Sequence, residues 1–284
     1  MATNSSAVGD LRPLTLAELL DRAFTLYRNH FWLFAGITAI AQGLVFILML
    51  PFGYYWVVGT AVKSATMSPG KPILAGAIGG LLSLVAYFAS EVATIYAVSE
   101  IYLGRSVTIR QAYSRARGKI GRIVWLTVLT ILAVMGGTIL LVFPGIYIMC
   151  RTWVAVPAAL LEDLPARSAL NRSFALTKGD AGRIFIVLTL LILVGLAAAS
   201  ILQYPFQIAA GIIKEGPIAQ ALTMLATLGA MMAQILVGPI GLITVALFYY
   251  DLRVRKEAFD LQMMLTTLPG LAAAPAVSAP PAIS

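Results

Sequence analysis

Long apolar blocks alternate with short charged segments along the whole chain. A bilayer core about 30 Å thick needs about 20 apolar residues in helical form. The blocks are apolar on every face, whereas strands of a membrane β-barrel alternate over about ten residues. The pattern therefore predicts six transmembrane helices, at residues 31–50, 73–99, 123–142, 145–161, 184–203 and 218–250.

Two of these blocks, residues 73–99 and 218–250, are longer than a bilayer is thick. A helix of such length must tilt, kink or protrude from the membrane. Pro239 lies inside the last block, where it removes a backbone donor and crowds the preceding turn. We expect a kink, or a break in the helix, at Gly238 and Pro239.

The charged segments have a helical period of their own. Apolar residues recur every three or four positions in the segments that begin at Thr15, Thr108 and Ala166. Thr15 and Glu18 have the spacing of a capping box, which starts a helix. We therefore predict an all-α integral membrane protein, with six transmembrane helices arranged as three hairpins. Each hairpin is preceded by a cytoplasmic amphipathic helix at the membrane interface.

The three segments are similar to one another when they are shifted by 93 and 57 residues. Two sets of residues then coincide: Leu16, Ile109 and Ala166, and Arg22, Arg115 and Arg172. This indicates a single membrane domain, residues 1–267, built from repeat-like units at about 15–103, 108–161 and 166–256. The alternative is that amphipathic segments share such a period by chance. Residues 268–284 are rich in Ala and Pro and are expected to be disordered.

Composition agrees with a membrane protein. The chain is 60% hydrophobic and 11% charged, whereas a soluble domain has about 25% charged residues. Outside the spans, 16 of 19 Lys and Arg residues fall in alternate segments. Since positive segments stay on the cytoplasmic side, both termini are expected in the cytoplasm.

Part of this positive charge lies on or next to the predicted amphipathic helices. Basic residues beside an apolar stripe are attracted to anionic lipid surfaces. We therefore expect membrane lipids, anionic ones by this chemistry, as partners; a protein partner is left open, and no nucleic acid is expected. The predicted headgroup collar consists of Arg22, Arg110, Arg115, Arg117, Lys119, Arg122 and Arg172.

Four segments resemble the membrane-domain family of glycerophosphoryl diester phosphodiesterases. They read "RPLTLAELLDRAFTLYRNHF", "FPGIYIMCRTWVAVPAALLED", "SALNRSFALTKGD" and "LFYYDLRVRKEAFDL". In that family the phosphodiesterase activity belongs to a separate soluble domain, for which this chain has no room. The resemblance implies a fold and a location in a bacterial cytoplasmic membrane, with a link to lipid or glycerophosphodiester metabolism, more than an activity.

Catalytic chemistry has little support in the sequence. Metal-dependent hydrolysis of phosphodiesters needs clustered carboxylates and usually histidine, whereas the chain has one histidine, His30, and one cysteine, Cys150. His30 is interpreted as an interfacial anchor and Cys150 as a small packed side chain. No cofactor and no metal site is expected, and the protein is expected not to be an enzyme.

Three polar residues are predicted to lie deep in the membrane. Counted from the cytoplasmic helix ends at 1.5 Å per residue, Glu91 and Gln42 lie about 18 Å deep and Arg151 about 16 Å. Because an isolated charge in a bilayer is costly, Glu91 is expected to face Arg151, with Gln42 nearby. This layer fixes helix packing in an accessory or organising membrane protein, or, as the alternative, carries a small solute in a transporter.

Overall fold

The computed structural model describes residues 14–61, 70–213 and 216–257, without the side chains of residues 48–77. The predicted tail at 268–284 lies outside this part. Within it, helices follow one another and no strand occurs. The helices are α1 (Leu16–Asn29), α2 (Phe31–Ala61), α3 (Gly70–Tyr102), α4 (Ile109–Ala116), α5 (Ile120–Leu140), α6 (Val142–Thr152), α7 (Ala155–Leu161), α8 (Ala166–Leu176), α9 (Ala181–Leu202), α10 (Tyr204–Ile213) and α11 (Pro217–Glu257).

The predicted apolar blocks are helical. Five stretches of the described chain are long and apolar enough to cross a membrane, and a sixth is counted if the bent pair of α1 and α2 is one span. Those two helices meet at 81°, next to His30, which is exposed at the bend. The prediction of an all-α integral membrane protein is therefore confirmed. The pairing of its spans as transmembrane hairpins stays a prediction.

Two details differ from the predicted spans. Helix α11 runs without a break from Pro217 through Pro239 to Glu257, so the chain is not interrupted at Gly238 and Pro239, and the kink expected there stays a prediction. At 1.5 Å per residue its 41 residues reach about 62 Å, twice the thickness of a hydrocarbon core. Helix α10 was not predicted as a separate element, because it continues the apolar composition of α9.

The amphipathic segments are helical, and their apolar stripes are buried against the protein. Thr15 caps α1 and Glu18 completes the expected capping box. Leu19 and Ala23 of α1 are 0% exposed. On α4 the buried residues are Ala112 and Ala116, and on α8 they include Ala166, Ala169 and Ser173. The stripes thus pack onto neighbouring helices, and contact of the polar faces with lipid headgroups stays a prediction.

The core lies where these short helices meet the C-terminal halves of α3 and α11. One cluster joins Leu19 of α1 to Phe248 and Leu252 of α11, and another joins Ala23 to Phe34 of α2. A third packs α3 against α5, α7 and α8. By contrast, only 17% of the most apolar window of α5 and 11% of that of α9 is buried. The outer faces of these two helices are therefore free to contact lipid.

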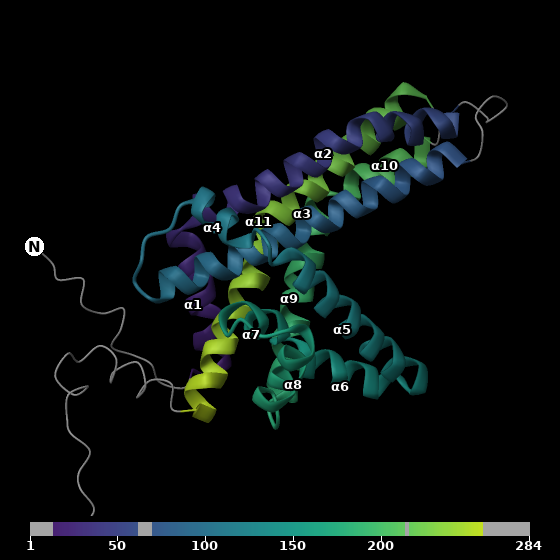
Figure 1. The fold of residues 1–284 in the computed structure, drawn as a ribbon. Coiled ribbons are helices and arrows are strands. Elements are labelled where there is room, and N and C mark those ends of the chain that lie inside the picture. The colour runs from purple at the N-terminus through teal and green to yellow at the C-terminus, as the bar shows by residue number, and fades with distance from the viewer. Residues whose placement is uncertain (1–13, 62–69, 214–215, 258–284) are drawn as a thin grey trace, which may run out of the picture.

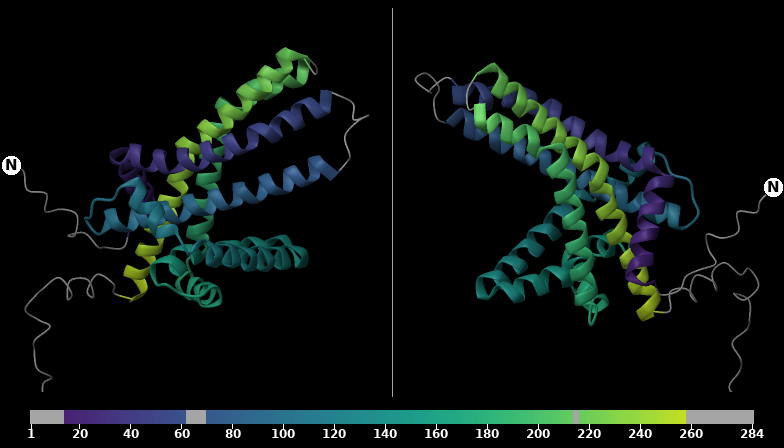
Figure 2. Two further views of the ribbon diagram at one scale, coloured as in Figure 1. Left: turned by 45° about the horizontal axis from the view of Figure 1, so that its top comes forward. Right: turned by 180° about the vertical axis from the view of Figure 1, so that it is seen from behind.

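Two arms diverge from this core (Figures 1 and 2). One contains α2, α3, α10 and the first half of α11, and the other is the pair α5 and α6. The second arm turns at one residue, Leu141, between the two helices. A Cβ atom at Gly145 would lie 2.9 Å from Cα of Thr138, so only glycine allows this approach.

The end of the second arm is apolar. Residues 139–143, which read "ILLVF", are 62% to 84% exposed. The turn satisfies part of its own backbone, because the N–H of Leu141 donates to the carbonyl of Gly137 and the N–H of Gly145 donates to that of Leu141. The tip therefore presents apolar side chains around a partly paired backbone.

Candidate functional site

A cavity of about 690 Å³ lies between α2, α3 and α11. Its volume is within the range of about 300 to 1,000 Å³ that is typical of sites for small molecules. The wall is mostly apolar, and no charged residue lines it. Its polar residues are Thr38 and Gln42 from α2, Ser83, Tyr87 and Ser90 from α3, and Thr227 and Gln234 from α11.

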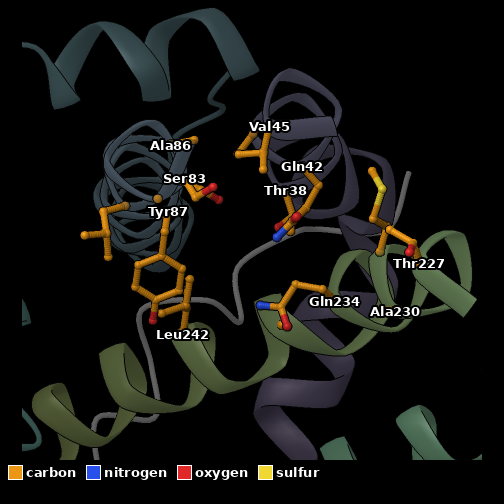
Figure 3. A pocket seen from close by; sticks show the side chains of 16 residues that line it. Thr38, Gln42, Val45, Ser83, Ala86, Tyr87, Thr227, Ala230, Gln234 and Leu242 are labelled. Atoms are coloured by element: carbon orange, nitrogen blue, oxygen red, sulfur yellow. The ribbon is translucent and has the colours of Figure 1, made fainter. Parts of the chain in front are cut away.

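Two amides face each other across this cavity. Gln42 projects from α2 and Gln234 from α11, and both point into the space between the helices (Figure 3). Neither amide has a hydrogen-bond partner among the described residues, and the same holds for the hydroxyl of Tyr87. These three groups are available to a bound molecule.

Unlike the two amides, three hydroxyl groups in the cavity wall already donate hydrogen bonds. Thr38 donates to the carbonyl of Phe34, Ser83 to that of Gly79 and Thr227 to that of Thr223. Each bond returns to the residue's own helix four positions earlier, a common way to satisfy Ser and Thr in a helix. These hydroxyls thus add polarity to the wall, and their donors are already occupied.

The cavity opens to the side of the helices. Leu84 and Tyr87 line it, and they are 53% and 47% exposed. Both lie in the part of α3 that is long and apolar enough to span a membrane. In a bilayer, a span of this kind lies among acyl chains, so a molecule dissolved in the bilayer would have access to the cavity from this side.

Glu91 directly follows Ser90, the last residue of α3 that lines the cavity. It is four positions after Tyr87 and seven after Leu84, so the three residues share one helix face. Glu91 is partly exposed. Within the described chain its carboxylate forms neither an ion pair nor a hydrogen bond. Glu91 is therefore a carboxyl group without a partner in the described chain, and the cavity beside it has no charged lining residue.

Arg151 does not meet Glu91. Its guanidinium donates to the hydroxyl of Tyr147 at 3.4 Å and to the backbone carbonyl of Phe174, and both aromatic rings lie within 6 Å of it. The backbone carbonyl of Arg151 accepts from Ser173 and Thr177. Among the described residues it has no ion-pair partner, so the expected Glu91–Arg151 pair is not formed. The cause is the direction of α6, which turns Arg151 toward α8.

Of the predicted polar layer, only Gln42 reaches the cavity. It is joined there by Gln234 and Tyr87, which sequence reasoning missed. Gln234 had a visible signal, because an amide inside the apolar sequence of α11 is costly unless it is paired. Tyr87 had no such signal, since an aromatic residue in a transmembrane span faces lipid as often as it faces the protein interior.

The predicted headgroup collar divides into two groups. Arg110, Arg115 and Arg117 are exposed on and just after α4 and have no carboxylate partner among the described residues. Lys119 and Arg122 instead bind Asp163, at 3.2 and 2.7 Å.

These contacts shift two acid–base equilibria. Hydrogen bonds from Arg122 and Lys119 lower the pKa of Asp163. Burial lowers the pKa of Lys119, but hydrogen bonds to the Tyr96 hydroxyl and to Asp163 outweigh it, so the pKa is raised overall. Asp163 and Lys119 are thus kept ionised as a link between the start of α5 and the α7–α8 connection.

Arg172 and the end of α11 form a cluster of charges that was not predicted. Arg172 binds Glu162 at 2.8 Å and Glu257 at 2.5 Å, and Tyr249 donates a 2.6 Å hydrogen bond to Glu162. These carboxylates raise the pKa of Arg172. Arg22 also has a partner within the protein. The four collar residues Arg22, Lys119, Arg122 and Arg172 are therefore engaged with the protein itself.

A second cluster centres on Asp251, whose side chain is fully buried. It accepts from the backbone N–H of Leu14, and it pairs with Arg183 and Arg255. All residues of the two clusters except Leu14 lie in or next to the segments "ALLED", "NRSFALTKGDAGR" and "LFYYDLRVRKE". The charged residues of these segments thus fasten α11 to α7, α8 and α9.

The fold and the cavity define a helical multi-pass membrane protein. Comparison of the chain with protein-family models, with curated proteins and with solved structures gave no match. The described residues hold no group of three or more His, Cys, Asp or Glu residues that is placed to bind a metal ion. The cavity is accordingly the feature on which a function can be based.

Proposed function

We propose that this chain is a noncatalytic, accessory protein of the bacterial cytoplasmic membrane that binds an amphiphilic molecule from the bilayer. The observation that carries the proposal is the mostly apolar cavity between α2, α3 and α11. Gln42 and Gln234 project into it and have no hydrogen-bond partner among the described residues. Unpaired amides in an apolar environment are costly, and a bound polar group would satisfy them. An occupant with an apolar body and a hydrogen-bonding end fits such a site.

The proposed orientation of the protein in the membrane rests on the pattern of charge along the chain. The basic segments alternate with the others along the chain, which favours a cytoplasmic position for both termini. The resemblance to the phosphodiesterase membrane domains favours a bacterial inner membrane and a role linked to lipid or glycerophosphodiester metabolism. Exposed Arg110, Arg115 and Arg117 would hold the α4 side of the protein at an anionic lipid surface.

Transport of a small solute through a Glu91–Arg151 pair has less support. The guanidinium of Arg151 contacts α6 and α8, and the described chain contains no ion pair between the two residues. The uninterrupted α11 also lacks the broken helix that forms the substrate site in many transporters. The geometry therefore supports binding more directly than translocation.

The proposal is tested by filling the cavity. Ser83→Phe places a ring in its wall, whereas Thr189→Phe adds the same ring to an exposed position of α9 outside the cavity. Both proteins are extracted in a mild detergent, and the molecules that co-purify are quantified by mass spectrometry. We expect one amphiphile near stoichiometry with the native chain and with Thr189→Phe, and its loss from Ser83→Phe.

Thermal unfolding of each variant separates loss of the ligand from loss of the fold. Gln42→Leu with Gln234→Leu is a second variant, which keeps the volume of the side chains and removes the amides. The proposal is wrong if well-folded Ser83→Phe retains the same molecule in the same amount, or if no molecule accompanies the native protein.

A further inference from the structure

Glu91 is the ionisable residue closest along α3 to the cavity wall, and it forms no ion pair with any described residue. It shares a helix face with Leu84 and Tyr87, which line the cavity. The lining itself is uncharged. A carboxylate at membrane depth is normally paired or faces a functional pathway, and Arg151, the cation expected from the sequence, is turned to α8. The carboxyl group of Glu91, without a partner among the described residues, therefore lies at the margin of the space that a ligand would fill.

Tyr87 is a second group near the cavity that attracts a positive charge. Its ring belongs to the cavity wall (Figure 3). In the sequence of α3 it lies one helical turn before Glu91. The face of an aromatic ring attracts organic cations, and the attraction grows when the pair is out of water. A carboxylate and a phenol ring on one face of α3 form a site that favours positive charge.

The remaining wall sets the shape of the ligand. The cavity volume of about 690 Å³ suits one compact molecule. Apolar residues such as Ala41, Val45 and Leu242 surround its body, and the amides of Gln42 and Gln234 offer neutral hydrogen bonds. No Lys or Arg is present in the lining to hold a phosphate.

We infer that the amphiphile bound between α2, α3 and α11 is a compact lipophilic cation, with its charge beside Glu91 and Tyr87. This inference rests on the proposed function, since it names the class of molecule for the same cavity. An anionic lipid is disfavoured because Glu91 would repel its headgroup and the wall would not neutralise it. A neutral lipid would satisfy the amides and leave Glu91 unbalanced.

The test uses the full chain in nanodiscs of uncharged phosphatidylcholine, with tetraphenylphosphonium as the cationic probe and 1,2-dioctanoylglycerol as the neutral one. Binding is measured by equilibrium dialysis. We expect saturable binding of tetraphenylphosphonium at one site per chain, weakened at least tenfold by Glu91→Gln and also weakened by Tyr87→Leu. Glu100→Gln, on the same helix beside Arg105, is the matched control and should bind as the native chain does.

The outcomes separate the two proposals. If the native chain binds dioctanoylglycerol and not tetraphenylphosphonium, the cavity binds amphiphiles and the inference about charge is wrong. If neither probe binds and no amphiphile co-purifies, both proposals fail. Equal binding of tetraphenylphosphonium by Glu91→Gln and the native chain, with unchanged thermal unfolding, would also overturn the role of Glu91.

Discussion

The backbone N–H of Leu14 donates a 2.7 Å hydrogen bond to Oδ1 of Asp251, which lies 237 residues further along the chain. The other carboxylate oxygen of Asp251 accepts from Arg255 at 2.9 Å and from Arg183 at 3.4 Å. Both arginines also donate to the backbone carbonyl of Leu14. One buried carboxylate thus fixes the residue that enters α1 against α9 and α11.

Asp251→Asn should be strongly destabilising. The substitution leaves Arg183 and Arg255 without their buried counter-charge, and loss of one partner of a buried pair costs about 3 to 5 kcal/mol. Asp163→Asn is the matched control, because the side chain of Asp163 is 68% exposed and water screens an exposed ion pair, so its loss should cost little. Unfolding in detergent by urea measures both. Equal stability of the two variants would contradict the central place of Asp251.

Arg151 and Glu91 should act independently. Arg151→Gln removes the contacts with Tyr147 and Phe174 and should lower stability, and Glu91→Gln should not restore it. Residues without a shared contact show additive effects within about 0.5 kcal/mol. A double-mutant cycle on thermal unfolding tests this expectation. Recovery of stability in the double variant would mean that the two charges meet in the native protein.

Tyr249 should depend on Glu162 for its contribution to stability. Its hydroxyl donates at 2.6 Å to a carboxylate that also binds Arg172, and hydrogen bonds to charged groups are worth about 1.5 to 3 kcal/mol. Tyr249→Phe should cost an amount in this range in the native background. In Glu162→Gln the same change should cost clearly less, as measured by the free energy of unfolding; an identical cost in both backgrounds would exclude the coupling.

The three exposed arginines on and just after α4 should hold anionic lipid. Replacing Arg110, Arg115 and Arg117 by Gln removes up to about 1 kcal/mol of attraction for each charge near the surface. We expect fewer phosphatidylglycerol molecules retained in native mass spectra of the triple variant. Lys119→Gln serves as the comparison, because Lys119 is already bound to Asp163, and it should change retention little.

The orientation predicts which cysteines are accessible from outside the cell. Ser114 and Ser168 are exposed at the proposed cytoplasmic face, so cysteines placed there should resist an impermeant thiol reagent in intact cells. A cysteine at position 68, which lies outside the described residues, should react. Cys150→Ala provides the background, since the native thiol is buried. Labelling at Ser114→Cys in intact cells would reverse the topology.

Hydrophobic length and period were enough to predict the apolar helices. Twenty or more apolar residues have few alternatives in a bilayer, and helices formed at the predicted blocks. The capping box of Thr15 and Glu18 was equally local and is present. These features depend on neighbouring residues in the sequence, so no knowledge of the tertiary arrangement was needed.

The residues that contact each charged side chain could not be predicted from the local sequence. Depth along a helix places Glu91 and Arg151 at similar levels, but it does not say in which direction each side chain points. The rotation of α6 and the break before α7 decide that Arg151 contacts Phe174. Arg172 was assigned to lipid headgroups for a related reason. Its periodicity marks a polar face, and only the tertiary fold brings Glu162 and Glu257 to that face.

The one-residue turn between α5 and α6 has a consequence for how the protein enters a membrane. Residues 139–143 have no charge and no hydrophilic side chain, and the 21 residues of α5 reach about 32 Å. The pair can therefore insert as a closed unit from one side, without carrying a water-soluble loop across the hydrocarbon layer. Reporter enzymes or protease sites placed at this turn would add a polar segment that the native pair does not carry, and would so change how the pair inserts.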